Sequence, residues 1–124
     1  MEDKMKASKF HGQGLNCAEC VIKAYNEEHG TDIPVAIGSG LGGGNAVGSL
    51  CGAVNAANII IGYLKGRENG LEANIAKPCV KKAMDSIDER YGTAICLELK
   101  EDKNSCDEII DFAYDNLKNV MDNK

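Results

Sequence analysis

The residues with the most chemistry in this chain are its cysteines. The chain has 124 residues, and six of them are cysteine. A deprotonated cysteine is both a soft metal ligand and a redox nucleophile, so such a set indicates metal binding, electron transfer or thiol–disulfide exchange. Inside a cell, where thiols are kept reduced, these uses are more common than structural disulfides. The six are Cys17, Cys20, Cys51, Cys79, Cys96 and Cys106.

The first two cysteines form a C-x-x-C motif, Cys17 to Cys20. Dithiol switches use this spacing, and so does one half of many metal sites. The residue directly after Cys20 is Val21 and not histidine, which excludes attachment of a c-type haem, and no predicted strand precedes the motif as it would in a thioredoxin-like fold. Each cysteine taken singly can also be a small, buried packing residue. The fold must therefore decide which sulfurs come together.

Apolar residues recur at helical spacing in almost every regular segment of the chain. Asn16 can cap a helix that Gly30 ends. Ser105 and Glu108 form an S-x-x-E capping box at the start of the last helix. The sequence predicts helices at about 17–29, after Asp32, at 49–65, at 71–91 and from 105 onward.

The helix at 49–65 is apolar on all sides apart from two asparagines, so we expect it to be buried and central. A glycine-rich stretch at 38–48 precedes it. Pro78, inside the helix predicted at 71–91, should kink that helix or mark a restart. We therefore predict an all-α fold, a compact bundle of about five helices around this central helix, forming one domain over residues 1–124.

Charge and hydropathy exclude several function classes. The formal net charge is −5 and no basic cluster stands out, so nucleic-acid binding is not expected. Residues 1–10 lack the apolar core of a signal peptide. The longest apolar run is well short of the about 20 residues that a membrane span requires. We therefore expect a cytoplasmic protein without a membrane span.

Several cysteines fall in the first turn of a predicted helix or half-helix. The dipole and the free N–H groups at a helix start stabilise a thiolate. We expect converging helix starts to gather several sulfurs in one inward-facing pocket. The cysteines placed in this way are Cys17, Cys51, Cys79 and Cys106.

The glycine-rich stretch satisfies the dinucleotide pattern G-x-G-x-x-G at residues 38–43. That fingerprint needs a βαβ unit, and no second strand is predicted, so nucleotide binding is not expected. Close backbone approach is the better interpretation, because glycines beside Cys51 leave room for a bound centre. Free N–H groups in such a loop can also bond to cluster sulfides or thiolates. The glycines expected at a cofactor are Gly42, Gly43, Gly48 and Gly52.

The two histidines are weaker candidate ligands. His29 is expected to interact with the C-terminal dipole of the first long helix. His11 lies in a glycine-containing lead-in. Neither a Cys–His pair nor a Ser–His–Asp triad can be argued from the spacing.

Three segments and two later cysteines resemble the C-GCAxxG-C-C family of redox-active proteins. They are GLNCAECV at 14–21, SGLGGG at 39–44, CGAVNA at 51–56, and then Cys96 and Cys106. The resemblance covers roughly residues 14–110 and keeps the family's order. It implies that the four characteristic cysteines are Cys17, Cys51, Cys96 and Cys106.

This sequence departs from the family pattern at three places. Ala56 stands where the motif ends in glycine, and Cys20 and Cys79 are additional. A similar module occurs in split-Soret cytochromes, beside haem-attachment motifs that this chain lacks. By that analogy the resemblance implies electron transfer and an iron–sulfur centre.

Three hypotheses follow. In the first, Cys17, Cys51, Cys96 and Cys106 bind an iron–sulfur cluster or a single metal ion, for redox sensing or for electron transfer with a partner protein. In the second, the protein is a metal-free thiol–disulfide oxidoreductase or switch whose nucleophile is Cys17 or Cys51. In the third, it is a helical interaction module with structural cysteines. The buried helix and the glycine loop are also compatible with a homodimer.

Overall fold

The computed structural model describes residues 6–122, and this part of the chain is all-α. Its single β pairing is an isolated antiparallel bridge between Leu50 and Ile95. The five α-helices are α1 (Cys17–His29), α2 (Gly52–Lys65), α3 (Ala76–Tyr91), α4 (Cys96–Glu101) and α5 (Cys106–Asp122). Three short helical turns lie between or before them: η1 (Ala7–Gln13), η2 (Val35–Gly38) and η3 (Gly44–Gly48).

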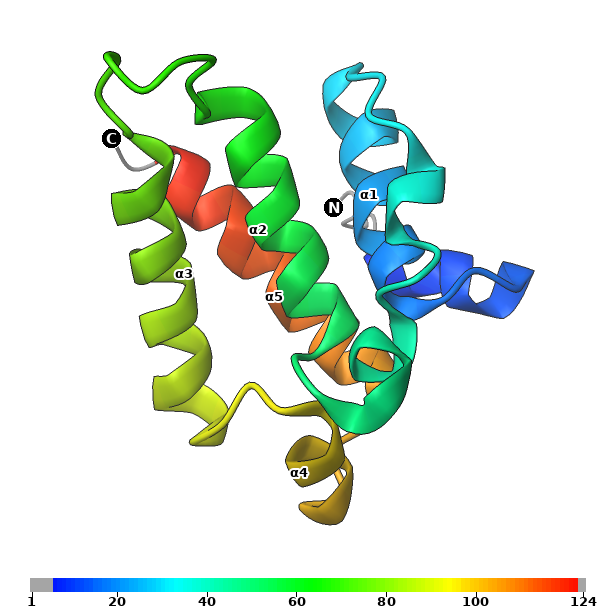
Figure 1. Cartoon of the computed structure of the whole chain (residues 1–124). Coiled ribbons are helices and arrows are strands. Elements are labelled where there is room, and N and C mark those ends of the chain that lie inside the picture. The colour runs from blue at the N-terminus through cyan, green and yellow to red at the C-terminus, as the bar shows by residue number, and fades with distance from the viewer. Residues whose placement is uncertain (1–5, 123–124) are drawn as a thin grey trace.

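Helix α2 is the centre of the bundle, because it packs against α1, α3 and α5 (Figure 1). Its inward residues are mostly small or β-branched, which lets the neighbouring helices approach closely. Ile60 and Ile61 are fully buried. This confirms the predicted central helix. The last turn is an exception, since Tyr63 and Leu64 are 57% and 38% exposed.

Helix α1 begins and ends as its sequence predicts. The side chain of Asn16 accepts a hydrogen bond from the Glu19 N–H at 2.8 Å, and the Glu19 carboxylate accepts one from the Asn16 N–H at 2.8 Å. This reciprocal pair satisfies two donors that the first turn would otherwise leave free. Gly30 then ends the helix in the left-handed region, with φ of 68°.

Helix α3 corrects the prediction of a longer helix over 71–91. It begins at Ala76, and the residues before it form a loop in which Leu71 is 99% exposed. Pro78 is the third residue of the helix, so it lies at a helix start, as the predicted restart requires. The first N–H groups of any helix lack an intrahelical partner, so the missing donor of proline costs nothing there.

The predicted capping box of α5 forms only in part. Ser105 Oγ accepts a hydrogen bond from the Glu108 N–H at 3.4 Å. The Glu108 carboxylate does not return to the cap; it accepts hydrogen bonds from Arg90 at 3.1 Å and from Tyr91 at 3.0 Å, at the end of α3. A tertiary contact has therefore replaced the local one.

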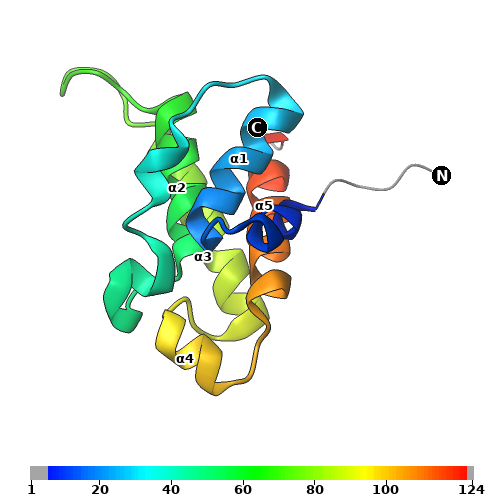
Figure 2. The same cartoon turned by 90° about the vertical axis from the view of Figure 1, so that its right-hand side faces the viewer.

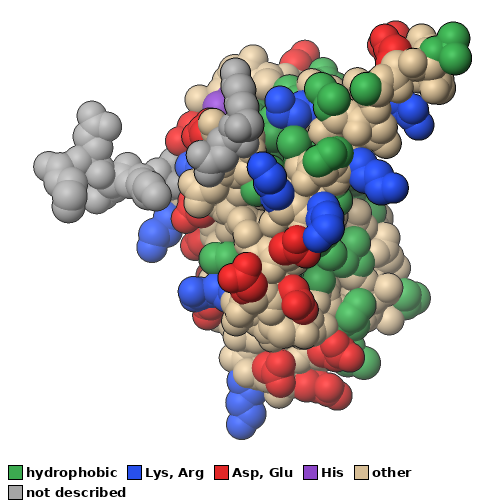
Figure 3. Space-filling view, turned by 90° about the vertical axis from the view of Figure 1, so that its left-hand side faces the viewer, with side chains coloured by type: hydrophobic (Ala, Val, Ile, Leu, Met, Phe, Trp, Pro, Cys, Tyr) green, Lys and Arg blue, Asp and Glu red, His purple; other side chains and the backbone are tan. Residues whose placement is uncertain are grey.

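The outer surface carries charges of both signs. On the face formed by α3, acidic and basic side chains are interspersed and apolar side chains lie along one edge (Figure 3). Within residues 6–122 there is no helix with the length and apolar character to cross a bilayer. The view in Figure 2 shows that α4 and the segment before α2 form one end of the molecule. Four of the six cysteines, Cys17, Cys51, Cys96 and Cys106, lie near that end.

Candidate functional site

Four cysteines stand where four helices begin. Cys17, Cys96 and Cys106 are the first residues of α1, α4 and α5, and Cys51 immediately precedes α2. First-turn placement is therefore confirmed for Cys17 and Cys106, whereas Cys51 is the cap residue just before the first turn of α2. Cys79 is the fourth residue of α3, near its start as predicted. Cys96, which the sequence left in an ambiguous segment, also begins a helix.

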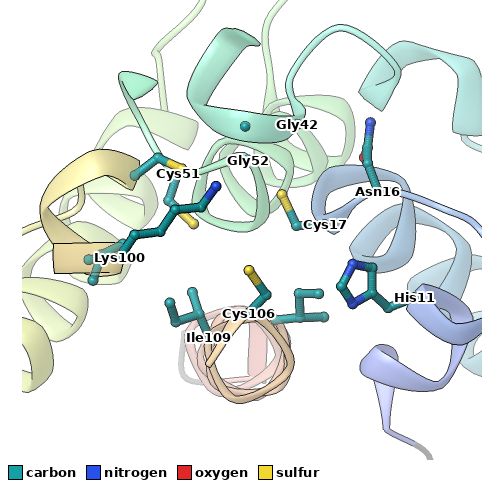
Figure 4. A pocket seen from close by; sticks show the side chains of 13 residues that line it. His11, Asn16, Cys17, Gly42, Cys51, Gly52, Lys100, Cys106 and Ile109 are labelled. Carbon is teal, nitrogen blue, oxygen red and sulfur yellow. The ribbon is translucent and has the colours of Figure 1, made fainter. Parts of the chain in front are cut away.

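These four cysteines line one cavity of about 390 Å³. In Figure 4 the labelled side chains of Cys17, Cys51 and Cys106 turn toward the same space. Cys51 is buried, Cys17 and Cys96 are half-buried, and Cys106 is exposed. The structure thus brings together residues that lie far apart in the sequence, whereas their role as metal ligands stays a prediction.

Backbone pairing sets Cys51 beside Cys96. Around the bridge of Leu50 and Ile95, the Cys51 N–H donates to the Ala94 carbonyl at 2.8 Å, and the Cys96 N–H donates to the Ser49 carbonyl at 2.6 Å. The segments before α2 and α4 therefore run antiparallel and are held in register. This register places Cys51 and Cys96 next to each other at the starts of α2 and α4.

Gly52 supplies the space that the Cys17 sulfur occupies. A methyl group added to Gly52 would lie 2.5 Å from Cys17 Sγ and 2.8 Å from the Leu41 carbonyl oxygen. Both separations are far below van der Waals contact, so only glycine fits without displacement. The predicted close backbone approach is therefore present at Gly52.

The other predicted glycines divide into two groups. Gly42 and Gly43 line the cavity together with Gly52, whereas Gly48 is not among its lining residues and faces Leu97. A cofactor-binding role for any of these glycines stays a prediction. The sequence reasoning missed Gly44, where an added methyl group would lie 2.7 Å from Cys96 Cβ.

The glycine stretch contains a left-handed turn rather than a nucleotide-binding loop. The consecutive φ values from Gly43 to Ala46 are 66°, 67°, 58° and 68°. The left-handed region costs Ala46 roughly 1–2 kcal/mol, whereas asparagine, as at position 45, adopts it more readily. The Ser49 N–H donates to the Gly44 carbonyl across the turn at 2.8 Å, and Cys96 leaves no room for a side chain at Gly44. Backbone strain is thus concentrated beside the cysteine cavity.

Asn16 connects the start of α1 to the glycine stretch. Its Nδ2 donates to the carbonyls of Gly38 and Ser39, both at 3.2 Å. Its side chain also leaves no room for a methyl group at Gly42. One residue therefore caps the helix that carries Cys17 and fixes one wall of the cavity.

Burial opposes a free thiolate at Cys51. The pKa of the Cys51 thiol is raised to about 11, mainly by burial; hydrogen bonds from the N–H groups of Val54 and Ala53 lower this pKa, and the neighbouring Cys17 and Cys96 add to the increase. The N–H groups at the helix start thus lower the pKa of Cys51, as predicted, but desolvation raises this pKa by more. The expectation that this position stabilises a thiolate by itself is therefore wrong for the metal-free protein.

A His–Asp pair at the cavity was not predicted. His11 lines the cavity, and its Nδ1 lies 2.8 Å from Asp107 Oδ1. With Nδ1–H donating to the carboxylate, Nε2 is left as the lone-pair nitrogen. Ser8 binds Asp111 through its backbone N–H at 2.9 Å and its hydroxyl at 2.8 Å, which docks η1 on α5. The two partners of the His–Asp pair are 96 positions apart, so no local pattern reveals them.

Cys20 and Cys79 lie outside the cavity. Cys20 is fully buried, donates to the Leu15 carbonyl at 3.7 Å, and has its pKa raised by burial to about 12. Cys79 lines a separate hollow with residues of α3 and the end of α5. The C-x-x-C motif therefore does not present two sulfurs to one space. His29 is also remote from the cavity and stacks on Tyr25.

Among residues 6–122, no three His, Cys, Asp or Glu side chains are grouped closely enough to hold a metal ion. The six cysteines are all free thiols in this structure. The four cysteine sulfurs therefore line the cavity without converging on a single point where one metal ion could bind.

Comparison with known proteins gives one family. Neither the curated proteins nor the solved structures contain a match to this chain. A family model with the description "Putative redox-active protein (C_GCAxxG_C_C)" matches residues 15–120, which include all four cavity cysteines. The chain belongs to this C_GCAxxG_C_C family.

Proposed function

We propose that the protein is an electron carrier whose cysteine cavity holds an iron–sulfur cluster. The observation that supports this most strongly is that four helix-start cysteines line one cavity. Four thiolates are the usual protein ligands of [2Fe–2S] and [4Fe–4S] clusters. The proposed ligands are Cys17, Cys51, Cys96 and Cys106.

The size of the cavity favours a cluster over a single ion. A single ion requires its ligands to converge on one point, and no such group exists among residues 6–122. In a cluster, iron and sulfide lie between the thiolates, so the cysteine sulfurs stand further apart. A cavity of about 390 Å³ leaves room for such a centre. Its cationic iron would also offset the burial that disfavours the Cys51 thiolate.

The surroundings suit electron exchange. Leu99, Ile109 and Ile110 form an apolar wall of the cavity, which restricts water and thereby influences the reduction potential. Cys106 is exposed, so one edge of the centre would lie close to the surface. A centre held by these residues would supply one-electron chemistry between a reduced donor protein and an oxidised acceptor.

Anaerobic purification and reconstitution with iron and sulfide test the proposal. We expect visible absorption together with bound iron and acid-labile sulfide. Cys96→Ser should lose most of this signal, whereas Cys79→Ser is the matched control and should keep it, because Cys79 lies outside the cavity. A colourless wild-type protein that retains no iron would refute the proposal, and so would a Cys96→Ser variant that loads like wild type.

A further inference from the structure

Of the residues that the structure describes, basic but not acidic side chains line the cysteine cavity. His11 and Lys100 are the two basic ones, and no aspartate or glutamate within 6–122 is among the lining residues. The chain as a whole has the opposite bias, with a formal net charge of −5. The local charge of the cavity therefore differs in sign from that of the protein.

Helix geometry explains why Lys100 reaches the cavity. Lys100 follows Cys96 by one helical turn in α4, and residues with that spacing share a helix face. Between them, Leu99 is 1% exposed and anchors the helix against the core. In Figure 4 the Lys100 side chain extends from α4 toward Cys51, and His11 is drawn on the opposite side of the cavity.

The two basic side chains differ in their partners. His11 has a carboxylate partner, because its Nδ1 lies 2.8 Å from Asp107 Oδ1. Among residues 6–122, the ion pairs join other lysines, Arg90 or His11 to carboxylates and include none with Lys100. Within the described part of the chain, Lys100 is therefore the cavity lysine that has no carboxylate partner.

A centre held by four thiolates carries net negative charge, and each one-electron reduction makes it one unit more negative without forming or breaking a bond. A nearby ammonium group attracts the reduced state more strongly than the oxidised state. We propose that Lys100 is the charge-compensating residue of this cavity, which stabilises the loaded centre and raises its reduction potential. This inference rests on the proposed function, since it requires a negatively charged centre.

Three variants test the role of Lys100 in the full-length protein loaded with iron and sulfide. Lys100→Gln removes the charge, and Lys100→Arg keeps it. Lys103→Gln removes an equal charge from the turn that follows α4, outside the cavity. The measurements are bound iron per chain and the midpoint potential, obtained by titration with dithionite and followed by visible absorption.

We expect Lys100→Gln to change the ratio of oxidised to reduced centre about tenfold at fixed ambient potential, which lowers the midpoint by about 59 mV for one electron, or to lose bound iron. Lys100→Arg and Lys103→Gln should resemble wild type in both measurements. The inference is overturned if Lys100→Gln equals wild type in both, or if either control shows the same deficit. Failure of the wild-type protein to load would instead refute the proposed function itself.

Discussion

The variant Gly52→Ala tests whether Gly52 packs closely against Cys17 at the wall of the cavity. The added methyl group would lie 2.5 Å from Cys17 Sγ, 2.8 Å from the Leu41 carbonyl oxygen and 3.3 Å from Gly42 Cα. Two of these atoms belong to backbone, so the added group cannot be accommodated by rotating one flexible side chain. Overpacking of this kind costs about 1–3 kcal/mol. Part of that cost is offset by the preference of helices for alanine over glycine.

Gly62 provides a matched control on the same helix. A methyl group added there meets no atom within 4 Å. Gly62→Ala should therefore gain the full helix preference, about 0.5–1 kcal/mol. The same glycine-to-alanine change is thus expected to lower the free energy of unfolding at position 52 and to raise it at position 62.

Urea unfolding followed by circular dichroism measures both effects. We expect Gly52→Ala to lower the free energy of unfolding by about 1–2 kcal/mol and Gly62→Ala to raise it. Because Cys17 must move in Gly52→Ala, this variant should also retain less iron after reconstitution than Gly62→Ala. A Gly52→Ala protein as stable as wild type, or equal losses in the two variants, would refute the described contact between Gly52 and Cys17.

Three further predictions follow from single side chains. Asn16→Ala should lose about 1–2 kcal/mol in thermal unfolding, since it removes a helix cap and two hydrogen bonds to the glycine stretch; no loss would contradict this role. Mass spectrometry of the metal-free protein should find Cys106 alkylated first and Cys20 last, because Cys106 is exposed and Cys20 is fully buried; the reverse order would count against the structure. The pKa of the Cys51 thiol is higher in the folded protein than in the unfolded chain, so the protonated thiol favours the folded state. This contribution of Cys51 to the free energy of unfolding is complete below pH 9.0 and is lost as the pH rises toward about 11. The loss is about 1.4 kcal/mol per pH unit. The difference between wild type and Cys51→Ala in urea unfolding should narrow over that window, and a constant difference would argue against a raised pKa.

Local signals in the sequence are sufficient to predict the positions of most of the helices. The cap at Asn16 depends on a residue three positions away, and the amphipathic patterns of α1 and α5 extend over several turns. The cysteines at those helix starts could therefore be placed in advance. The start of α3 was placed too early, because residues 71–75 look like helix by composition but bury almost nothing.

The features that could not be predicted from the sequence depend on contacts between residues far apart in the chain. Helix α4 is too short to show a hydrophobic period, and the backbone pairing with Ser49 fixes the position of Cys96. The His11 and Asp107 pair joins elements near opposite ends of the chain. At Cys51, burial by residues from other helices reverses the pKa shift that the helix start alone would produce.

Anomalous X-ray diffraction at the iron edge, from crystals of the anaerobically loaded protein, tests the central claim most directly. The account predicts iron peaks inside the cavity, within bonding distance of the sulfurs of Cys17, Cys51, Cys96 and Cys106. Iron bound elsewhere, or no iron in crystals of a protein whose four cysteines are intact, would contradict it.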